Sequence, residues 1–310
     1  MKGSPPCTAA ELRRFLEEKT GLAVTRLEMV KECSRPENFV VEMAAGARLL
    51  VKCVPPKEPG RTLFEKHSLP HFSELEGVHC AAKLRYGPWQ FGECLVAALE
   101  WCAGGRVMPD ALSPAEERDL VRSYGGLSAA MQRASAVLPA RDSVAIRRET
   151  MPLLAGGACR PLRQFVERAI PESALSYDSS RLCVIHGDFH HGNIHFKDGC
   201  VTGIFDFESF RFGYAAEDWL RYVVCGAEHL HWFDVSGRRR LLALFRRLLP
   251  LARADEWRAA AGALLIRKIW RRFSLHKGPR AWFVLNMMFR LGFYRRILSM
   301  IDGAEKGGRK

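Results

Sequence analysis

The residues best suited to chemistry lie in a short central segment, His186-Gly187-Asp188-Phe189-His190-His191-Gly192-Asn193. A further carboxylate, Asp206, follows thirteen residues after Asn193, at the end of an apolar run. One carboxylate can accept the proton of a hydroxyl group, and an amide oxygen with a second carboxylate supplies the hard oxygen ligands that Mg²⁺ prefers. These are the components that a phosphoryl-transfer site needs.

Two short β-structures are predicted to position these groups. The apolar strand at 183–185 leads into the central segment, and a hairpin at 194–205 leads to Asp206. If these strands end side by side, Asp188, Asn193 and Asp206 converge on one point. The sequence therefore predicts a single site built from two β-structures.

The order and spacing of these residues resemble the aminoglycoside phosphotransferase and choline kinase family, which shares the protein-kinase fold. The family pattern is His-Gly-Asp, three variable residues, Gly-Asn, and then an aspartate that ends the next hairpin. The resemblance continues at Gly213 and at Glu217-Asp218-Trp219-Leu220, and it is strongest across 182–222. It implies a bilobal α+β fold, with a small antiparallel sheet and one key helix in the first lobe and a larger, mainly helical second lobe. It also implies transfer of the γ-phosphoryl group of ATP, with Mg²⁺, to a hydroxyl group.

The resemblance gives each matching residue an expected role. Asp188 would be the catalytic base or would orient the hydroxyl nucleophile, and Asn193 and Asp206 would hold Mg²⁺. His186 and Asp218 would support the catalytic loop.

The nucleotide would be bound mainly by the N-terminal part of the chain. The sequence predicts a hairpin of strands at 39–43 and 49–54. Lys52 lies in its second strand, where the family places the lysine that contacts the α- and β-phosphates. Its carboxylate partner on a helix would be Glu65, with Glu74 as the alternative. Backbone groups of Glu100 and Cys102 would meet the adenine edge.

The loop expected to cover the phosphates departs from the family pattern. It is Cys33-Ser34-Arg35-Pro36-Glu37-Asn38, without the glycine that such loops usually contain. A cradle made only of backbone amides is therefore not expected. Arg35 and the Ser34 hydroxyl are the expected substitutes.

The length of 310 residues suits one large domain or two modest ones. We predict an N-terminal helix within 1–21, a nucleotide-binding lobe at 22–102, and a catalytic and acceptor-binding helical lobe at 103–310. Neither a signal-peptide core nor an apolar run long enough to cross a membrane is present, and the ten cysteines occur singly. These features predict a cytoplasmic protein, with peripheral attachment to the inner face of a membrane as an alternative.

The net charge of +13 comes from the C-terminal quarter, because residues 236–310 hold 19 Lys/Arg and only four acidic residues. A predicted helix at 264–273 would place Arg267, Lys268, Arg271 and Arg272 on the face opposite its apolar stripe, where like charges repel. The hypothesis is that these residues, or the Arg238–Arg240 run, attract an anionic acceptor or an anionic membrane surface. A solvated face remains the alternative, and nucleic acid is disfavoured because no recognised binding module accompanies the charge.

Two other functions fit part of this pattern. A metal-dependent hydrolase could use His186, His190 and His191, but it would not explain Asn193 and the Asp206 hairpin. A catalytically silent binding module with the kinase fold would not need the full set of reactive residues, which is present. The expected acceptor is a sugar, an amino alcohol or a lipid-linked sugar. A polycationic aminoglycoside is disfavoured because the predicted acceptor lobe is strongly basic.

Overall fold

The computed structural model describes residues 8–30, 38–44, 46–54, 83–133, 151–152, 154, 159–169, 178–209, 211–231, 233–275 and 280–307. The chain forms two compact units. Unit 1 comprises 1–106, 113–136 and 193–209, and unit 2 comprises 107–112, 137–192 and 210–310. The three domain ranges expected from the sequence stay a prediction.

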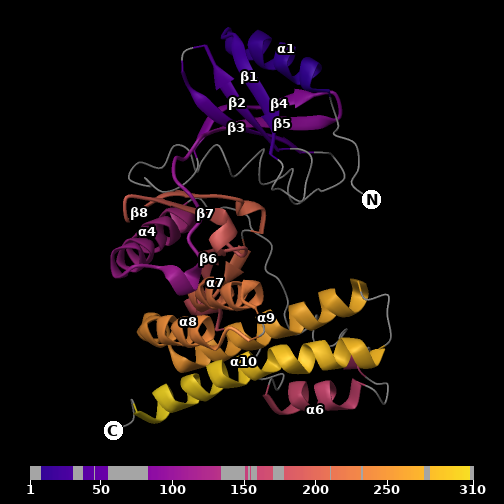
Figure 1. Cartoon of the computed structure of the whole chain (residues 1–310), viewed down its shortest axis with the longest axis vertical. Coiled ribbons are helices and arrows are strands. Elements are labelled where there is room, and N and C mark those ends of the chain that lie inside the picture. Colours follow the sequence, from indigo (N-terminus) through magenta and orange to yellow (C-terminus); the bar gives the residue numbers. More distant parts are fainter. Residues whose placement is uncertain are drawn as a thin grey trace. The chain divides into compact units, whose positions relative to one another are not determined.

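Unit 1 contains a five-stranded sheet in which every neighbouring pair is antiparallel (Figure 1). In the order β1-β2-β3-β5-β4, the strands are β1 (Val24–Met29), β2 (Asn38–Met43), β3 (Arg48–Val54), β5 (Cys94–Glu100) and β4 (Leu84–Phe91). The predicted hairpin is confirmed, with Phe39 of β2 opposite Val51 of β3. Gly87-Pro88, a pair that typically separates strands, lies inside β4, so the strand continues beyond the end at residue 86 that the sequence indicates. An edge strand tolerates proline, since one side of it needs no ladder hydrogen bond.

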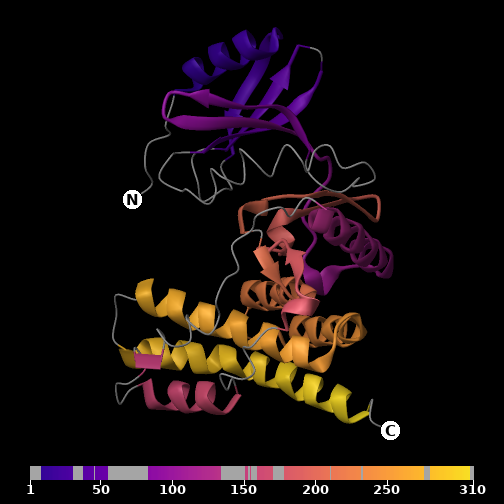
Figure 2. The same cartoon turned by 180° about the vertical axis from the view of Figure 1, so that it is seen from behind.

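One face of this sheet is covered by α1 (Ala9–Thr20), as both views show (Figures 1 and 2). A capping box, typical of the sequence Thr8-Ala9-Ala10-Glu11, starts the predicted N-terminal helix: the Thr8 hydroxyl accepts the Glu11 N–H, and the Glu11 carboxylate accepts the Thr8 N–H. The apolar face of α1 packs on alternate strand residues, which are Phe39, Val41, Met43, Leu49, Val51, Cys53, Val96 and Ala98. Because strand side chains alternate, Lys52 lies on the face of the sheet away from α1.

Unit 1 also contains α4 (Pro114–Arg133) and the predicted hairpin of β7 (Ile194–Lys197) and β8 (Cys200–Ile204). The two turn residues of the hairpin, Asp198 and Gly199, have φ values of 52° and 79°. Positive φ at both positions is typical of the tight turns that join antiparallel strands. Asp119 of α4 accepts the N–H of Val201 at 2.7 Å, and this bond fastens the hairpin to the helix.

The segment 103–105 resembles a linker in the sequence, but in the structure Gly105 forms an isolated antiparallel bridge with Phe196. Gly105 and Phe196 exchange two backbone hydrogen bonds, of 2.9 and 2.8 Å. Gly104 has a φ of 106°, and a Cβ atom there would lie 2.2 Å from the Phe196 carbonyl oxygen. The glycine therefore allows close approach of two backbones rather than freedom of movement.

Replacing Gly104 by alanine is expected to destabilise unit 1. The positive φ alone costs about 1–2 kcal/mol for a residue with a side chain, and the Phe196 carbonyl group cannot move aside without breaking its own pairing. We expect Gly104→Ala to lower the free energy of unfolding by at least about 2 kcal/mol, measured by urea denaturation. The matched control is Gly105→Ala, because Gly105 has no neighbour within 4 Å of an added Cβ. Equal stability of the two variants would contradict this account of the segment.

Unit 2 is mainly helical and contains one short antiparallel pair, β6 (Cys183–Ile185) with β9 (Arg211–Gly213). Its helices are α6 (Arg160–Ala169), α7 (Ala215–His229), α8 (Val235–Leu248), α9 (Ala254–Leu275) and α10 (Arg280–Gly307). Helix α7 packs against α8 and α9, and α10 packs against α9 and α6 (Figures 1 and 2). The helical character predicted beyond residue 213 is confirmed in the described part.

Short 3-10 turns connect several of these elements, at Pro109–Ala111, Ser179–Arg181, His191–Asn193, Phe207–Ser209 and Leu249–Leu251. No helix of the described residues is long and apolar enough to cross a membrane. The combination of an antiparallel sheet and a helical unit confirms the predicted α+β class.

Candidate active site

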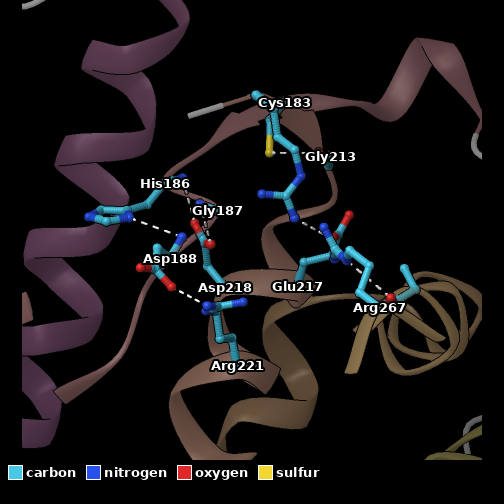
Figure 3. Close-up of polar contacts among 11 residues, drawn as sticks. Cys183, His186, Gly187, Asp188, Gly213, Glu217, Asp218, Arg221 and Arg267 are labelled. Carbon is cyan, nitrogen blue, oxygen red and sulfur yellow. Dashed lines mark hydrogen bonds and ion pairs between the residues drawn. The ribbon is translucent and has the colours of Figure 1, made fainter. Parts of the chain in front are cut away.

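The loop that carries Asp188 follows β6 and is fastened to the first turn of α7. The fully buried Asp218 carboxylate accepts the backbone N–H of His186 at 2.7 Å and that of Gly187 at 2.8 Å (Figure 3). Hydrogen bonds to an ionised acceptor are stronger than neutral ones, and these two occupy one oxygen each. Asp218 therefore makes the contacts that its predicted supporting role requires.

Two histidines orient the same loop through their Nδ1 atoms. His186 Nδ1 accepts the Asp188 N–H at 3.2 Å, and His190 Nδ1 accepts the Gly192 N–H at 3.0 Å. A neutral imidazole that accepts through one nitrogen carries its proton on the other. His190 therefore presents an Nε2 donor, which lies 3.7 Å from Asp188 Oδ2.

Asp188 is held as an ion by the groups around it. Its Oδ1 atom contacts the Arg221 guanidinium, which extends from α7 (Figure 3). Burial raises the pKa of Asp188, but the hydrogen bond from His190 and the charge of Arg221 outweigh it and hold the pKa well below its ordinary value. A carboxylate of low pKa is a weak base. It is therefore suited to orienting a hydroxyl group and accepting its proton late in transfer, rather than to removing the proton before the attack.

A buried ionic group lies next to this loop in unit 2. Glu217 accepts hydrogen bonds from Arg211 of β9 at 2.8 Å and from Arg267 of α9 at 2.5 Å. The Glu217 and Arg211 side chains are 3% and 4% exposed, so loss of one member would leave an uncompensated buried charge, at a cost of about 3–5 kcal/mol. The group ties three elements together at the residue that precedes Asp218.

Unit 1 brings together Lys52 and Asp206, residues far apart in the sequence. Lys52 Nζ lies 3.1 Å from Asp206 Oδ1, and the two side chains are 6% and 40% exposed. Lys52 is therefore not the solvated strand residue that its charge alone would suggest. Asp206 has a φ of 65°, which is rare for a residue with a side chain and often occurs at functional sites.

Asn193 lies beside Asp206 at the open end of the β7–β8 hairpin. The Phe205 N–H donates to the Asn193 carbonyl at 2.9 Å, which places the two strand ends next to each other. An amide oxygen and a partly exposed carboxylate form a donor set that fits Mg²⁺. Asp188 belongs to unit 2 and these two residues to unit 1, so their convergence with Asp188 stays a prediction.

The segment predicted to meet the adenine leaves the sheet at the end of β5. The Glu100 N–H donates to the Lys83 carbonyl at 2.7 Å, and the Cys102 carbonyl lies 3.3 Å from His195 Nδ1. These contacts fasten the segment to β4 and to the β7–β8 hairpin. The nucleotide roles of Glu100 and Cys102 stay predictions.

Four other residues predicted at the nucleotide lie outside the described residues. These are Ser34, Arg35, Glu65 and the alternative to Glu65, Glu74.

The basic stripe expected on α9 is largely paired with carboxylates of α7. In addition to the Arg267–Glu217 contact, Lys268 Nζ lies 2.8 Å from Glu228 Oε2 and Arg272 Nη2 lies 3.2 Å from Glu228 Oε1. These carboxylates offset part of the like-charge repulsion expected on this face. Charge counted by segment missed this, because the partners precede residue 236 in the sequence.

Two further residues of the basic C-terminal quarter bear on a membrane contact. Arg240 donates to the carbonyl and to the carboxylate of Asp110, both at 2.8 Å. Trp270, which helical spacing would place with the core residues of α9, is 41% exposed. An anionic membrane contact through this quarter has no support from these contacts.

The histidine cluster does not form a metal site in the described part of the chain. His186 and His190 use Nδ1 for backbone N–H groups, and His191 packs its ring against His229 at 4.7 Å. Among the described residues, no three histidine, cysteine or carboxylate side chains gather as metal ligands. These positions give the hydrolase alternative no support.

Sequence reasoning missed Arg221, which contacts the central carboxylate. One signal was available: Arg221 follows Asp218 by three residues, so in a helix both lie on the same face. The partner of Arg221 is 33 residues away along the chain, and no local pattern indicates such a contact.

A model of the phosphotransferase enzyme family (APH) matches residues 32–272. Among solved structures, the aminoglycoside phosphotransferase APH(4)-Ia has a TM-score of 0.65 at 14% identity, covering 93% of this chain and 99% of its own. An aminoglycoside phosphotransferase from Alicyclobacillus acidocaldarius has a TM-score of 0.64 at 16% identity, covering 97% and 98%.

The amicoumacin kinase hAmiN has a TM-score of 0.59 at 14% identity, covering 93% of this chain and 96% of its own. Its structure contains AMP-PNP, Ca²⁺ and Ami. No curated protein sequence matches this chain. At these identities the structural likenesses show the fold, and they confirm the predicted protein-kinase-like fold.

Proposed function

The chain belongs to the phosphotransferase enzyme family, and on that premise we propose that it transfers the γ-phosphoryl group of ATP to a hydroxyl group of a small molecule. The observation that carries the proposal is the ionised Asp188 carboxylate on a loop held by Asp218. A loop fixed in this way can orient an attacking hydroxyl group with little loss of freedom at the moment of reaction.

The nucleotide end of the reaction is assigned to unit 1. Lys52 would contact the phosphates through its largely buried ammonium group, whose charge is poorly screened by water. Asn193 and Asp206 would hold Mg²⁺, which neutralises charge on the phosphate oxygens when it is bound. Structures of fold neighbours with AMP-PNP, and in one case with Ca²⁺, support the use of ATP and a divalent cation.

The acceptor end is assigned to Asp188. The acceptor oxygen attacks the γ-phosphorus atom, the bond to the oxygen of the leaving ADP breaks, and the hydroxyl proton passes to the Asp188 carboxylate. We propose that the transfer is direct, because none of the described serine, cysteine or histidine residues of the site is arranged as a covalent carrier. Most of the acceleration would come from positioning and from neutralised charge.

Acceptors of three kinds fit this chemistry: sugars, amino alcohols and lipid-linked sugars. The antibiotics named with the fold neighbours are not assigned to this chain as acceptors. We place the reaction in the cytoplasm, where ATP is available.

Nucleotide-dependent stabilisation tests the proposal without knowledge of the acceptor. We expect Mg²⁺ with AMP-PNP to raise the free energy of unfolding by about 2.7 kcal/mol at a hundredfold excess over the dissociation constant. Either component alone should have a smaller effect, and Zn²⁺ alone should have none. Stabilisation by Zn²⁺ that requires His186 and His190 would favour the hydrolase instead. Nucleotide binding with no ATP consumption against a broad panel of alcohols would favour the silent module.

A further inference from the structure

Three cationic side chains, Arg221 of α7 with Lys268 and Arg272 of α9, lie along the contact between α7 and α9. On α7 itself, Arg221, Cys225 and Glu228 follow one another on one face, at spacings of four and three residues. Arg221 contacts Asp188 at one end of this face, and Glu228 contacts Lys268 and Arg272 of α9 at the other. A helix rises 1.5 Å per residue, so the row spans about 10 Å, the length of a small molecule.

The charged side chains of this row are neither fully exposed nor fully buried. Asp188 and Arg221 are each 24% exposed, and the exposed fractions of Lys268 and Arg272 are 16% and 39%. Cys225 lies between the two ends of the row on α7. Burial raises the pKa of the Cys225 thiol, and Lys268 and Arg221 both act to lower it, so both cations lie within electrostatic reach of this residue.

Positive charge exceeds negative charge within this row. The three cations, Arg221, Lys268 and Arg272, are matched by two carboxylates, Asp188 and Glu228. Asp218 also acts on Arg221, but its two oxygens accept the backbone N–H groups of the catalytic loop.

Arg221 has hydrogen-bonding capacity beyond its contact with Asp188. A guanidinium group has five N–H donors in a planar fork, which can hold two anionic groups at once. The contact with Asp188 uses Nη2, and the Arg221 side chain is 24% exposed. The N–H groups of the fork that Asp188 does not occupy can therefore meet a second anion while Arg221 holds the carboxylate that orients the acceptor hydroxyl.

We infer that the acceptor is an anionic alcohol, and that Arg221, with Lys268 and Arg272, binds the carboxylate, phosphate or sulfate group of that alcohol beside Asp188. This inference deepens the proposed function and rests on it. Arg221 would repel an ammonium group at this place, so the inference narrows the three kinds of acceptor proposed above and disfavours a simple amino alcohol. A neutral acceptor would leave the cations without a second anion.

The first experiment uses inorganic sulfate as the probe, so it needs no knowledge of the acceptor. The unfolding temperature is measured with saturating Mg²⁺ and AMP-PNP, in sodium sulfate and in sodium chloride of equal ionic strength. Sulfate stabilises most proteins non-specifically, so the readout is the difference between variants. We expect a specific increase for the wild type and for Arg239→Gln, a control on the exposed side of α8. The increase should be lost in Arg221→Gln, Lys268→Gln and Arg272→Gln.

The second experiment measures ADP formation with matched alcohols: glycerol, glycerate, glycerol 3-phosphate and 3-aminopropane-1,2-diol. We expect the anionic members to have the highest kcat/KM. Arg221→Gln should raise their KM at least about tenfold, with the KM for ATP unchanged, and Arg221→Lys should restore part of the loss. Lys268→Gln and Arg272→Gln keep the test available if Arg221→Gln fails to fold.

Three results would overturn the inference. One is a sulfate effect that is absent from the wild type or equal in all variants. Another is a preference for the neutral or cationic alcohol. The third is a fall in kcat of Arg221→Gln at an unchanged acceptor KM, which would make Arg221 a positioning residue for Asp188 only. Failure of the proposed function is distinguishable, because it would abolish either the stabilisation by Mg²⁺ and AMP-PNP or ADP formation with every alcohol, the neutral and cationic ones included.

Discussion

Asp188→Asn is expected to lower kcat by about 10²–10⁴-fold, the usual share of a general base, with a further loss if the hydroxyl group is misoriented. The amide cannot accept the proton as the carboxylate does, whereas the backbone contacts of the loop with Asp218 do not involve the altered group. Binding of Mg²⁺ with AMP-PNP should stay within a factor of about three of the wild type, because nucleotide contacts are assigned to unit 1. Steady-state kinetics and calorimetry of nucleotide binding measure the two quantities.

The matched control for this substitution is Asp198→Asn. Asp198 is the exposed turn residue of the β7–β8 hairpin, with a φ of 52°, and asparagine adopts that conformation equally well. The control should keep full activity. An Asp188→Asn enzyme with kcat within about threefold of the wild type would rule out the role of Asp188.

Asp206→Ala is expected to abolish turnover through loss of the divalent cation. Asn193 alone would be a single protein ligand, too few to hold Mg²⁺ on the nucleotide. We expect kcat/KM to fall at least about 10²-fold, the usual effect of removing one group that stabilises transition-state charge. AMP-PNP without Mg²⁺ should bind as well as before or more tightly, because the carboxylate 3.1 Å from Lys52 no longer competes with the phosphates.

Calorimetry of AMP-PNP binding, with and without Mg²⁺, measures this difference directly. In the wild type, affinity should rise with Mg²⁺, and in Asp206→Ala the two affinities should be equal. Asp198→Asn is again the control, since Asp198 has no predicted ligand role and lies in an exposed turn. A Mg²⁺ dependence that survives in Asp206→Ala would remove Asp206 from the predicted metal site.

The parts of the fold that follow from local patterns were predictable from the sequence. The capping box at Thr8 needs only residues 8–11, and the β7–β8 hairpin needs only its alternation and the Asp198-Gly199 turn. The side of the sheet on which Lys52 lies follows from strand alternation alone. The fastening of the Asp188 loop by Asp218, which lies 32 residues from His186 along the chain, was expected only from the family resemblance.

Contacts that depend on packing between distant elements were not predictable in this way. Arg221 reaches Asp188, and Arg267 reaches Glu217, only because α7 packs against the loop and against α9. A count of charges by segment therefore described α9 as an unpaired cationic stripe. Gly104 illustrates the same limit, because its sequence context indicates flexibility, whereas the nearby Phe196 carbonyl requires a glycine.

Transfer of label from ATP to an organic acceptor tests the central claim most directly. The enzyme, Mg²⁺ and ATP labelled in the γ-phosphate are incubated with a panel of neutral, anionic and cationic alcohols, and the products are separated by anion exchange. We predict a labelled phosphate ester in equal amount to the ADP formed, and a rate of ester formation at least about 10²-fold lower with Asp188→Asn or Asp206→Ala. Label recovered only as inorganic phosphate, or an ester formed equally fast by Asp188→Asn, would contradict the assignment of a phosphotransferase that acts through Asp188.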